Sequence, residues 1–358
     1  ASKNSNLVLA FGHRFQLQQA GIYERLKSVF PKAEIVFAST SGQILGNRHY
    51  HEGIALTAVQ FKSARIESRA LDIDDYENSF KAGQALIDLL EQDGLKHVFV
   101  LSDGQFVNGS ELVQGMNAQL PENVKVTGGL AGDDARFEHT LVGLNSQPTK
   151  KKIVAVGFYG DNLHVTFGSQ GGWSAFGPER AVTKSDKNVL FALDGKSALD
   201  LYKSYLGEMA NELPGSALRF PLSIHLPDTD KYLVRTILSV DEEQQSMTFA
   251  GNLPEGCTAR LMKSNAENLI DGAQVAAGDC IQRMNGHPSP QLSIMVSCVG
   301  RKLVLDQLVE EEIEMANEEL GQPANTGFYS YGEICPILQE SKAELHNQTM
   351  TITTFSES

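Results

Sequence analysis

The segment LSIMVSCVGRKLVLDQLVEEEIEMANEELGQP, residues 292–323, decides the fold that we expect for this chain. Its first six residues are mostly apolar, as in a buried strand, and a helical pattern follows directly and ends in the helix-stopping letters GQP. The next stretch, TGFYSYGEI (326–334), has the composition of another strand. Because the chain must turn back towards the same sheet after the helix, we expect 326–334 to lie beside 292–297.

The first half of the chain shows the same alternation of strands and helices. Buried-strand patterns alternate with amphipathic helical patterns, and this alternation is typical of a layered domain. We therefore predict an α/β fold, with α+β as the alternative, built as two layered domains with mixed sheets flanked by helices. The predicted strands are 6–12, 33–40 and 97–104, and the predicted helices are 17–31, 76–94 and 110–120.

The length of 358 residues favours two domains, because single hydrophobic cores stop growing at roughly 250–300 residues. The stretch GWSAFGPERAVTKSDKN (172–188) loses strong periodicity and carries Gly, Pro and charge. We place the boundary there, near residue 180, so the predicted domains are 1–180 and 181–358.

Charge and composition exclude several classes of function. The formal charge of −14 disfavours nucleic-acid binding, which needs a basic face to neutralise phosphates. Nothing approaches 18 consecutive apolar residues, so we expect no membrane insertion and a cytoplasmic location. The four cysteines are far apart and show no CxxC pair, which makes structural zinc and disulfides unexpected. The main sequence signatures of hydrolases, nucleotide-binding loops and zinc proteases are absent, so we predict no catalytic residues.

The segment NTGFYSYGEICP (325–336) concentrates polar aromatic residues. Tyr329 and Tyr331 alternate along the predicted strand, so both rings are expected on one face of it. Two buried tyrosine hydroxyls need hydrogen-bond partners, which core packing alone does not supply. We therefore interpret this face as the floor of a binding site, and we expect Tyr-to-Phe changes to weaken ligand binding at little cost in stability.

Arg301 lies in the first turn of the predicted helix, where a cation opposes the helix dipole and invites a compensating anion. That anion is either a ligand or a nearby carboxylate of this acidic chain. If strand 326–334 returns beside 292–297, Arg301 faces Tyr329, Tyr331 and Glu333 across one pocket. An arginine fork, a carboxylate and aromatic rings complement an amino acid. The predicted ligand is therefore amino-acid-like, and the predicted binding residues are Arg301, Tyr329, Tyr331, Glu333, Ser297 and Cys298.

Several stretches together resemble a known family. SCVGRKLVL, followed by TGFYSYGEICP and then LHNQTMT, is similar to the C-terminal half of FIST-domain sensory proteins. Upstream, FASTSGQILG, GGLAGDD, FGPERAVTKS and LDGKSALDLYKSYLG resemble the other blocks of that family in their usual order. The resemblance covers nearly the whole chain. It implies a bacterial intracellular sensor with paired N- and C-terminal FIST regions, for which small ligands such as amino acids have been proposed.

Some stand-alone members of that family are haem proteins that sense nitric oxide and regulate histidine kinases or cyclic-di-GMP enzymes. This chain resembles them in showing no kinase or cyclase segment, so we expect it to signal in trans to such a partner. The leading hypothesis is a non-enzymatic small-ligand sensor. A haem-based nitric oxide sensor is one alternative, with His346, His225 or Cys298 as candidate haem ligands. A thiol-dependent enzyme is another, with Cys298 at a helix N-terminus as nucleophile.

Overall fold

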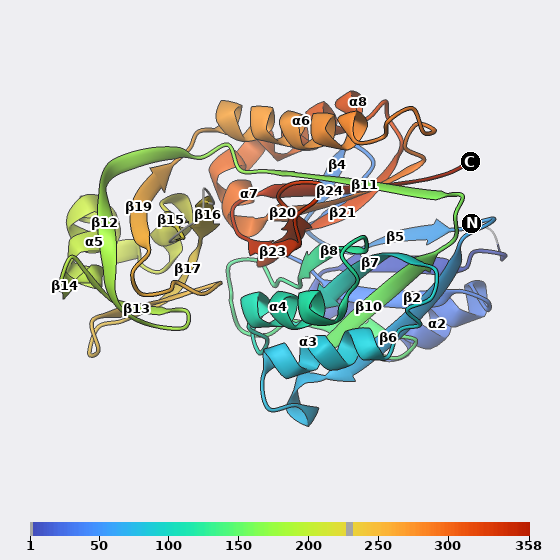
Figure 1. Cartoon of the computed structure of the whole chain (residues 1–358), viewed down its shortest axis with the longest axis horizontal. Helices are drawn as coiled ribbons and strands as arrows, with labels where there is room; N and C mark the ends of the chain where they lie inside the picture. The colour runs from blue at the N-terminus through green and yellow to red at the C-terminus, as the bar shows by residue number, and fades with distance from the viewer. Residues whose placement is uncertain (1–2, 227–231) are drawn as a thin grey trace.

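The computed structural model describes residues 3–226 and 232–358, which form two lobes (Figure 1). The small lobe is one continuous insertion, from the start of strand β12 at Ser174 to the end of β19 at Lys263. It has its own hydrophobic core, to which only Ile337 is added from outside the insertion. The large lobe contains the chain on both sides of the insertion, and most of the candidate site.

The large lobe consists of two six-stranded sheets that face each other. Inner sheet 1 follows the order β23-β22-β8-β7-β10-β6, and inner sheet 2 follows the order β11-β24-β20-β21-β3-β4. Inner sheet 1 contains β6 (Arg65–Asp72), β7 (Leu95–Ser102), β8 (Lys125–Leu130), β10 (Lys152–Tyr159), β22 (Gly332–Pro336) and β23 (Ala343–His346). Inner sheet 2 contains β3 (Gln43–Leu45), β4 (Arg48–Tyr50), β11 (Leu163–Gln170), β20 (Leu292–Cys298), β21 (Ala324–Ser330) and β24 (Met350–Glu357).

Helices cover the outer faces of both inner sheets, so the layers run helix, sheet, sheet, helix (Figure 1). Helices α3 (Ser79–Asp88) and α4 (Gly109–Gln119) pack on inner sheet 1, and α6 (Ala266–Gln282) and α8 (Val309–Glu319) pack on inner sheet 2. In β7, Val98 and Val100 face the helices, whereas Phe99 and Leu101 face the other sheet. Burial on both faces explains the continuous apolar run of this strand.

A third sheet, in the order β5-β1-β2-β9, joins the side of the large lobe. Its strands are β1 (Leu7–Gly12), β2 (Glu34–Ser39), β5 (Ile54–Val59) and β9 (Val142–Leu144), and the neighbouring helices are α1 (Arg14–Leu17) and α2 (Ile22–Val29).

The small lobe contains β12 (Ser174–Asp186), β13 (Val189–Leu193), β14 (Lys196–Ser197), β15 (Leu222–His225), β16 (Tyr232–Arg235), β17 (Ile237–Asp241), β18 (Ser246–Phe249), β19 (Thr258–Lys263) and α5 (Ala198–Leu206). Short 3-10 helices are η1 (Ile73–Asp75), η2 (Gly207–Glu212), η3 (Gly215–Arg219) and η4 (Asp306–Leu308).

The predicted α/β fold with mixed sheets flanked by helices is confirmed, as is the predicted neighbour of strand 292–297. Strands β20 and β21 pair in parallel, with Leu292 opposite Ala324 and Cys298 opposite Ser330. The single long helix predicted after β20 is wrong in one respect. It is divided into α7 (Val299–Leu305) and α8 by Asp306, whose φ of 50° lies outside the right-handed helical region.

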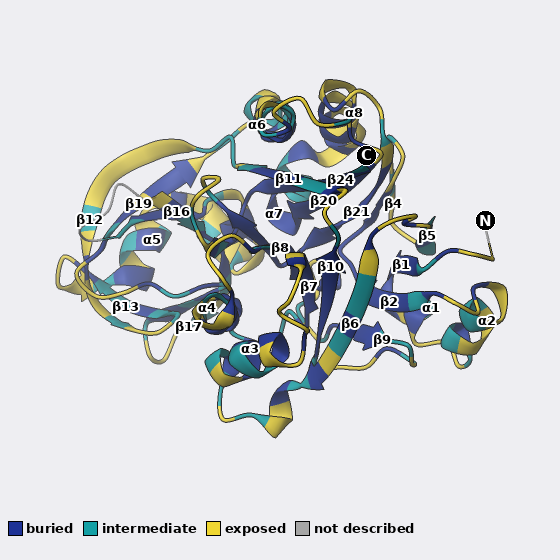
Figure 2. Cartoon of the chain, turned by 45° about the vertical axis from the view of Figure 1, so that its right-hand side comes forward, coloured by how far each residue is buried: buried dark blue, intermediate teal, exposed yellow. Residues whose placement is uncertain are grey.

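The two halves predicted from the sequence share both inner sheets. Strands β3, β4 and β11 from the first half complete inner sheet 2, and β22 and β23 from the second half complete inner sheet 1. The predicted boundary near residue 180 falls inside β12, which is largely exposed along its 13 residues (Figure 2). The predicted domain boundary at residue 180 concerns units that fold separately, and it stays a prediction. The chain enters the small lobe at about residue 174 and leaves it at about residue 263. In residues 3–226 and 232–358, no helix is long and apolar enough to span a membrane.

Candidate functional site

The carboxyl ends of parallel strands from all three large-lobe sheets meet at one place. Strands β1 and β2, β7 and β8, and β20 and β21 form parallel pairs. Beyond the ends of β8 and β2, the Gly132 amide donates to the Ser39 carbonyl at 2.9 Å, and the Ser41 amide donates to the Tyr329 carbonyl at 2.8 Å. Ligands of α/β sheets bind outside the carboxyl ends of the strands, so this convergence is the first candidate for a site.

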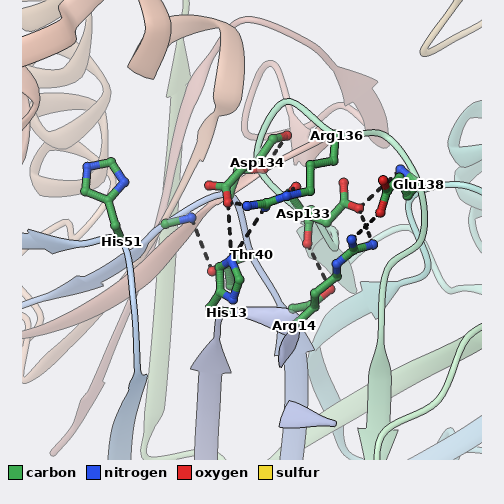
Figure 3. Close-up of polar contacts among 12 residues, drawn as sticks. His13, Arg14, Thr40, His51, Asp133, Asp134, Arg136 and Glu138 are labelled. Atoms are coloured by element: carbon green, nitrogen blue, oxygen red, sulfur yellow. Dashed lines mark hydrogen bonds and ion pairs between the residues drawn. The ribbon is translucent and has the colours of Figure 1, made fainter. Parts of the chain in front are cut away.

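Charged and polar side chains gather at these strand ends (Figure 3). They come from the loops after β1, β2 and β8, from the β4 hairpin and from α7. We call this set the strand-end cluster: His13, Arg14, Thr40, His49, His51, Asp133, Asp134, Arg136, Glu138 and Lys302.

Asp133 anchors the strand-end cluster from a fully buried position. It accepts a hydrogen bond from Arg14 at 2.9 Å and bonds from the amides of Glu138 and His139 at 3.2 and 3.1 Å. The Tyr331 hydroxyl also donates to it. Four donors converge on this carboxylate, so it is held rigidly and acts as a structural support for the residues around it.

Asp134 and Lys302 form the more exposed half of the cluster. Asp134 accepts from Arg136 at 2.6 Å, and its carboxylate lies 3.5 Å from the Lys302 amine. Burial acts to raise the pKa of Asp134, but Lys302 and Arg136 hold it below the ordinary value. Burial lowers the pKa of Lys302, and it lowers that of His49 to about 3 together with the nearby Lys302 charge. His49 is therefore neutral at physiological pH, and Lys302 is held less firmly protonated than a surface lysine.

Three buried nitrogens of this cluster lack a hydrogen-bond partner among the described residues: His13 Nδ1, Arg14 Nε and His49 Nε2. Unsatisfied buried donors and acceptors are costly, so they mark a place where a polar molecule is accommodated or the chain rearranges.

A cavity of about 180 Å³ lies beside the cluster, between the two lobes. We call it the interlobe pocket. The large lobe contributes Gly104, Gln105, Phe106, Val107, Asn108, Leu130 and Tyr331, and the small lobe contributes Asn188, Leu238, Phe249 and Ala250. No charged side chain appears in its lining among the described residues, which combines aromatic rings with amide groups.

Tyr331 connects the interlobe pocket with the strand-end cluster. Its side chain lines the pocket and stacks on Phe137 with ring centroids 4.6 Å apart. Its hydroxyl reaches Asp133 and donates to the Asp134 carbonyl at 2.9 Å. Of the six binding residues predicted from the sequence, Tyr331 is the one that borders this pocket.

The prediction that Tyr329 and Tyr331 share one face is wrong. Tyr329 lies in β21 of inner sheet 2 and packs among α6 and α8, whereas Tyr331 packs with the core of inner sheet 1. Between Ser330 and Gly332 the chain crosses from one sheet to the other. Two-residue alternation holds only within a continuous strand, so the crossing separates the two rings.

Arg301, Tyr329 and Ser297 do come together, but around a protein carboxylate. Arg301 and Glu312 are both fully buried and form an ion pair at 2.6 Å. Glu312 also accepts from the Tyr329 hydroxyl at 2.8 Å and from Ser297 at 3.1 Å. The anion that compensates Arg301 is therefore Glu312. The predicted pocket, in which Arg301 and Glu333 hold the two ends of an amino acid, is not assembled.

Glu312 is an exception on α8, because a run of glutamates such as that in residues 310–319 usually lies on a solvated helix face. Glu310, Glu311 and Glu314 are exposed, but Glu312 points into the core. Helical spacing is the signal that separates it from its neighbours, since Glu312 lies three residues after Val309 and four before Ala316 on the buried face of α8.

Glu333 and Cys298 are buried at the start of β22 and the end of β20. Glu333 accepts from Ser330 at 2.5 Å and from the Thr349 amide and hydroxyl at 3.2 and 3.1 Å. Burial raises its pKa to about 8. Burial and the nearby Glu333 also raise the pKa of the Cys298 thiol far above its usual value. A thiol held protonated in a core is a poor nucleophile, so the proposed enzyme alternative lacks an activated group.

Glu333 makes stability depend on pH in a defined direction. The folded chain keeps the Glu333 proton up to about pH 8, whereas an unfolded glutamate releases its proton near the ordinary pKa of 4.5. Stability from this group is therefore highest below pH 4.5 and falls as pH rises to about 8, at up to about 1.4 kcal/mol per pH unit. We expect Glu333→Gln to remove this fall, as measured by denaturant unfolding across that range. Parallel pH profiles for the two proteins would contradict the assignment.

Tyr331→Phe is expected to lower the free energy of unfolding by about 1.5–3 kcal/mol, because it removes a hydrogen bond to the buried Asp133 carboxylate. This replaces the expectation of little cost that the sequence suggested. Tyr202→Phe is the matched control. The Tyr202 hydroxyl donates to a neutral acceptor, the Phe220 carbonyl, at 2.8 Å, so we expect a loss of about 0.5–1.5 kcal/mol. Equal losses in urea unfolding would show that the charge of Asp133 contributes nothing.

The three haem-ligand candidates lie in different surroundings. Cys298 is a buried protonated thiol, and His225 stacks on Tyr232 at 4.4 Å in the small lobe. His346 Nε2 lies 2.9 Å from the Cys335 carbonyl and borders a cavity of about 230 Å³. Ligand cavities usually measure roughly 300–1,000 Å³, so this space is small for a porphyrin. Among the described residues, no group of three or more His, Cys, Asp or Glu side chains is placed to hold a metal ion.

The strand-end cluster was missed from the sequence, although a signal was present. The letters HR follow the first buried strand, ST follow the second, and GDD follow GGLA. Polar residues directly after buried strands mark carboxyl ends, and the carboxyl ends of parallel strands meet.

Comparison with known proteins gives a match over most of the chain. The model described as the FIST N domain matches residues 6–196, and that described as the FIST C domain matches residues 198–336. An uncharacterized protein of Methanocaldococcus jannaschii is 22% identical over 314 residues, which cover 81% of this chain and 59% of that protein, so the chain spans less than two thirds of its relative. The structure of PurLQS from Thermotoga maritima aligns over 89% of this chain and 74% of that chain, with 8% identity and a TM-score of 0.24, which is too low to support an argument about the fold.

Proposed function

Because the chain belongs to the FIST family, whose domains are sensory domains of signal-transduction proteins, we propose that it is a non-enzymatic sensor that binds a small ligand between its two lobes. The ligand changes the arrangement of the lobes, and a separate regulatory protein responds to that change. A histidine kinase or a cyclic-di-GMP enzyme, the partner class that the family resemblance suggests, is part of this proposal.

The observation that supports the proposal is the position of the interlobe pocket. A ligand shifts an equilibrium only if its affinity differs between two states. A molecule in this pocket touches Phe106 and Asn108 of the large lobe and Leu238 and Phe249 of the small lobe. Its affinity therefore depends on how the lobes are placed, which is the property that a sensor needs.

The connection between the lobes is narrow enough to act as a hinge. The chain enters the small lobe after Trp173 and leaves it at Ser264, whose hydroxyl donates to the Gly172 carbonyl at 2.6 Å. Away from the hinge, polar contacts join the lobes, including Asn108 to Asn252 at 3.1 Å. Domain interfaces that include polar contacts of this kind permit relative domain motion.

The neutral lining favours a small uncharged or zwitterionic ligand with an aromatic or amide group over a strongly charged one. Tyr331 and Phe106 offer rings, and Asn108, Asn188 and Gln105 offer amides. The amino-acid-like ligand therefore stays part of the proposal, although its contacts differ from those expected from the sequence. Tyr331 would also link a bound ligand to the strand-end cluster, because its ring lines the pocket and its hydroxyl donates to Asp133.

Trp173 allows a direct test, because it is the only tryptophan of the chain and lies at the hinge, where its indole donates to the Gln348 carbonyl at 2.8 Å. We expect at least one member of a panel of the standard amino acids and small neutral amides to change Trp173 fluorescence in a saturable way. Native mass spectrometry of the purified chain would detect a molecule that is already bound.

Ala250→Phe fills the interlobe pocket and is expected to abolish the response. Ala58→Phe is the matched control, because Ala58 is a similarly half-buried alanine that lines a different cavity within the large lobe. If both variants respond like the wild type, the ligand does not bind in the interlobe pocket. If no panel member binds and no molecule is retained, the amino-acid-like ligand class is wrong.

A further inference from the structure

The cavity of about 380 Å³ at the opposite end of β7 and β8 has a different chemical character from the interlobe pocket. It opens at the amino ends of these strands, between them, β11 and the end of α6. We call it the basic cavity. Its ionisable lining residues are Lys96, His97, Lys125, His164, Arg283 and His287.

We propose that the basic cavity is a second binding site, for a small polyanion with two or more separated oxyanion groups, such as an organic phosphate or a polycarboxylate. Three permanent cations line it, and no Asp or Glu appears in the lining among the described residues. This is unexpected in a chain with 44 acidic and 30 basic residues and a net charge of −14. A concentration of positive charge in a lining without carboxylates attracts anions and stabilises them.

Two of the cations are held in place by neutral carbonyl groups, so their charge is not neutralised. Lys125 donates to the carbonyls of Glu122, Glu340 and Ser341 at 3.0–3.2 Å. Arg283 donates to the Phe167 carbonyl at 2.5 Å.

These contacts fix both head groups without adding a negative charge. A preorganised cation loses little freedom when an anion binds, which favours affinity. Lys96 differs, because it pairs with the exposed Asp161 at 2.8 Å.

The size of the cavity and the number of its cations suit a ligand larger than a single monovalent anion. His97 of β7 pairs with Lys125 of β8, so Lys96 and Lys125 come from neighbouring strands, and Arg283 enters from the end of α6. The imidazole rings of His164 and His287 stack with their centroids 3.8 Å apart, and both rings line the cavity. The cavity volume lies within the roughly 300–1,000 Å³ of ordinary small-molecule sites.

Calorimetric titration with inorganic pyrophosphate and with citrate tests the proposal, with sodium acetate at matched ionic strength as the monovalent control. We expect saturable binding of at least one polyanion, weakened at higher salt. In a parallel NMR titration with the same anions, the imidazole proton signals of His164 and His287 should shift, which locates the ligand. Selective binding of pyrophosphate indicates the phosphate class, and selective binding of citrate indicates the polycarboxylate class.

Lys96→Gln and Arg283→Gln are each expected to weaken binding roughly ten- to hundred-fold, because each removes a charge-assisted contact. Lys96 is half exposed, so its variant is expected to fold even if Arg283→Gln does not. Lys203→Gln removes an equal charge from the small lobe and should leave binding unchanged. The proposal is overturned if neither polyanion binds, if acetate binds as well, or if Lys96→Gln binds with wild-type affinity. These outcomes are independent of the Trp173 response.

Discussion

Glu312→Gln is expected to lower the free energy of unfolding by about 3–5 kcal/mol, because it leaves the fully buried Arg301 cation without its anion. Small proteins have a total stability of about 5–15 kcal/mol, so this is a large fraction. The substitution is also expected to disturb the hinge, because Arg301 donates hydrogen bonds to the carbonyls of Gly171 and Leu269 next to it. Urea unfolding measures the loss of stability directly.

Glu314→Gln is the matched control on the same helix. Glu314 is exposed, so its variant should stay within about 0.5 kcal/mol of the wild type. The double variant Arg301→Met with Glu312→Leu removes both charges and is expected to recover only part of the stability, because the buried Tyr329 and Ser297 hydroxyls lose the acceptor that Glu312 provides. A loss for Glu312→Gln no greater than that for Glu314→Gln would show that the pair contributes nothing.

This expectation also changes how Arg301 variants are interpreted. If Arg301 bound a ligand, Arg301→Ala would remove binding and leave the chain folded. In the structure Arg301 holds α7, α8 and the lobe connection together. We therefore expect Arg301→Ala to unfold the protein at a lower denaturant concentration, and binding measured on it would say little about the ligand.

Gly115→Ala is expected to cost about 3 kcal/mol, at the upper end of the range for overpacked cores. Helices α3 and α4 cross so closely that a Cβ at Gly115 would lie 2.0 Å from the Phe80 carbonyl oxygen. At Gly83 on the facing helix a Cβ would lie 2.3 Å from the Leu112 carbonyl oxygen. Backbone atoms cannot move aside as a flexible side chain does, so the helices must separate, and the core that they cover on inner sheet 1 loosens.

Gly278→Ala in α6 is the control, since the nearest atom to its Cβ is the Glu319 carboxylate at 3.8 Å. Alanine is the better helix former by about 1 kcal/mol, so this variant should be stabilised by up to that amount. The two substitutions are chemically identical and are expected to have opposite signs. Thermal unfolding of both variants tests this, and a stabilised Gly115→Ala would mean that α3 and α4 lie further apart than the structure shows.

Local patterns along the chain were enough to predict the layers. The alternation of buried strands and amphipathic helices, and the return of 326–334 beside 292–297, follow from hydrophobic periodicity and short connections. These features depend on residues close in sequence. The position of Arg301 at a helix start also correctly required an anion, although the pattern did not say which one.

Tertiary structure alone decided the partners of the candidate residues. Arg301 forms its ion pair with Glu312 because the chain divides α7 from α8 at Asp306. Tyr331 and Tyr329 are separated because the chain crosses from one inner sheet to the other between them. The strand-end cluster and the interlobe pocket combine residues more than a hundred positions apart, such as Arg14 with Asp133 and Asn108 with Phe249. Hydrophobic periodicity shows which face of a helix or strand is buried. The contacts between different elements depend on how the strands pair and how the sheets are arranged, and packing of the whole chain determines that arrangement.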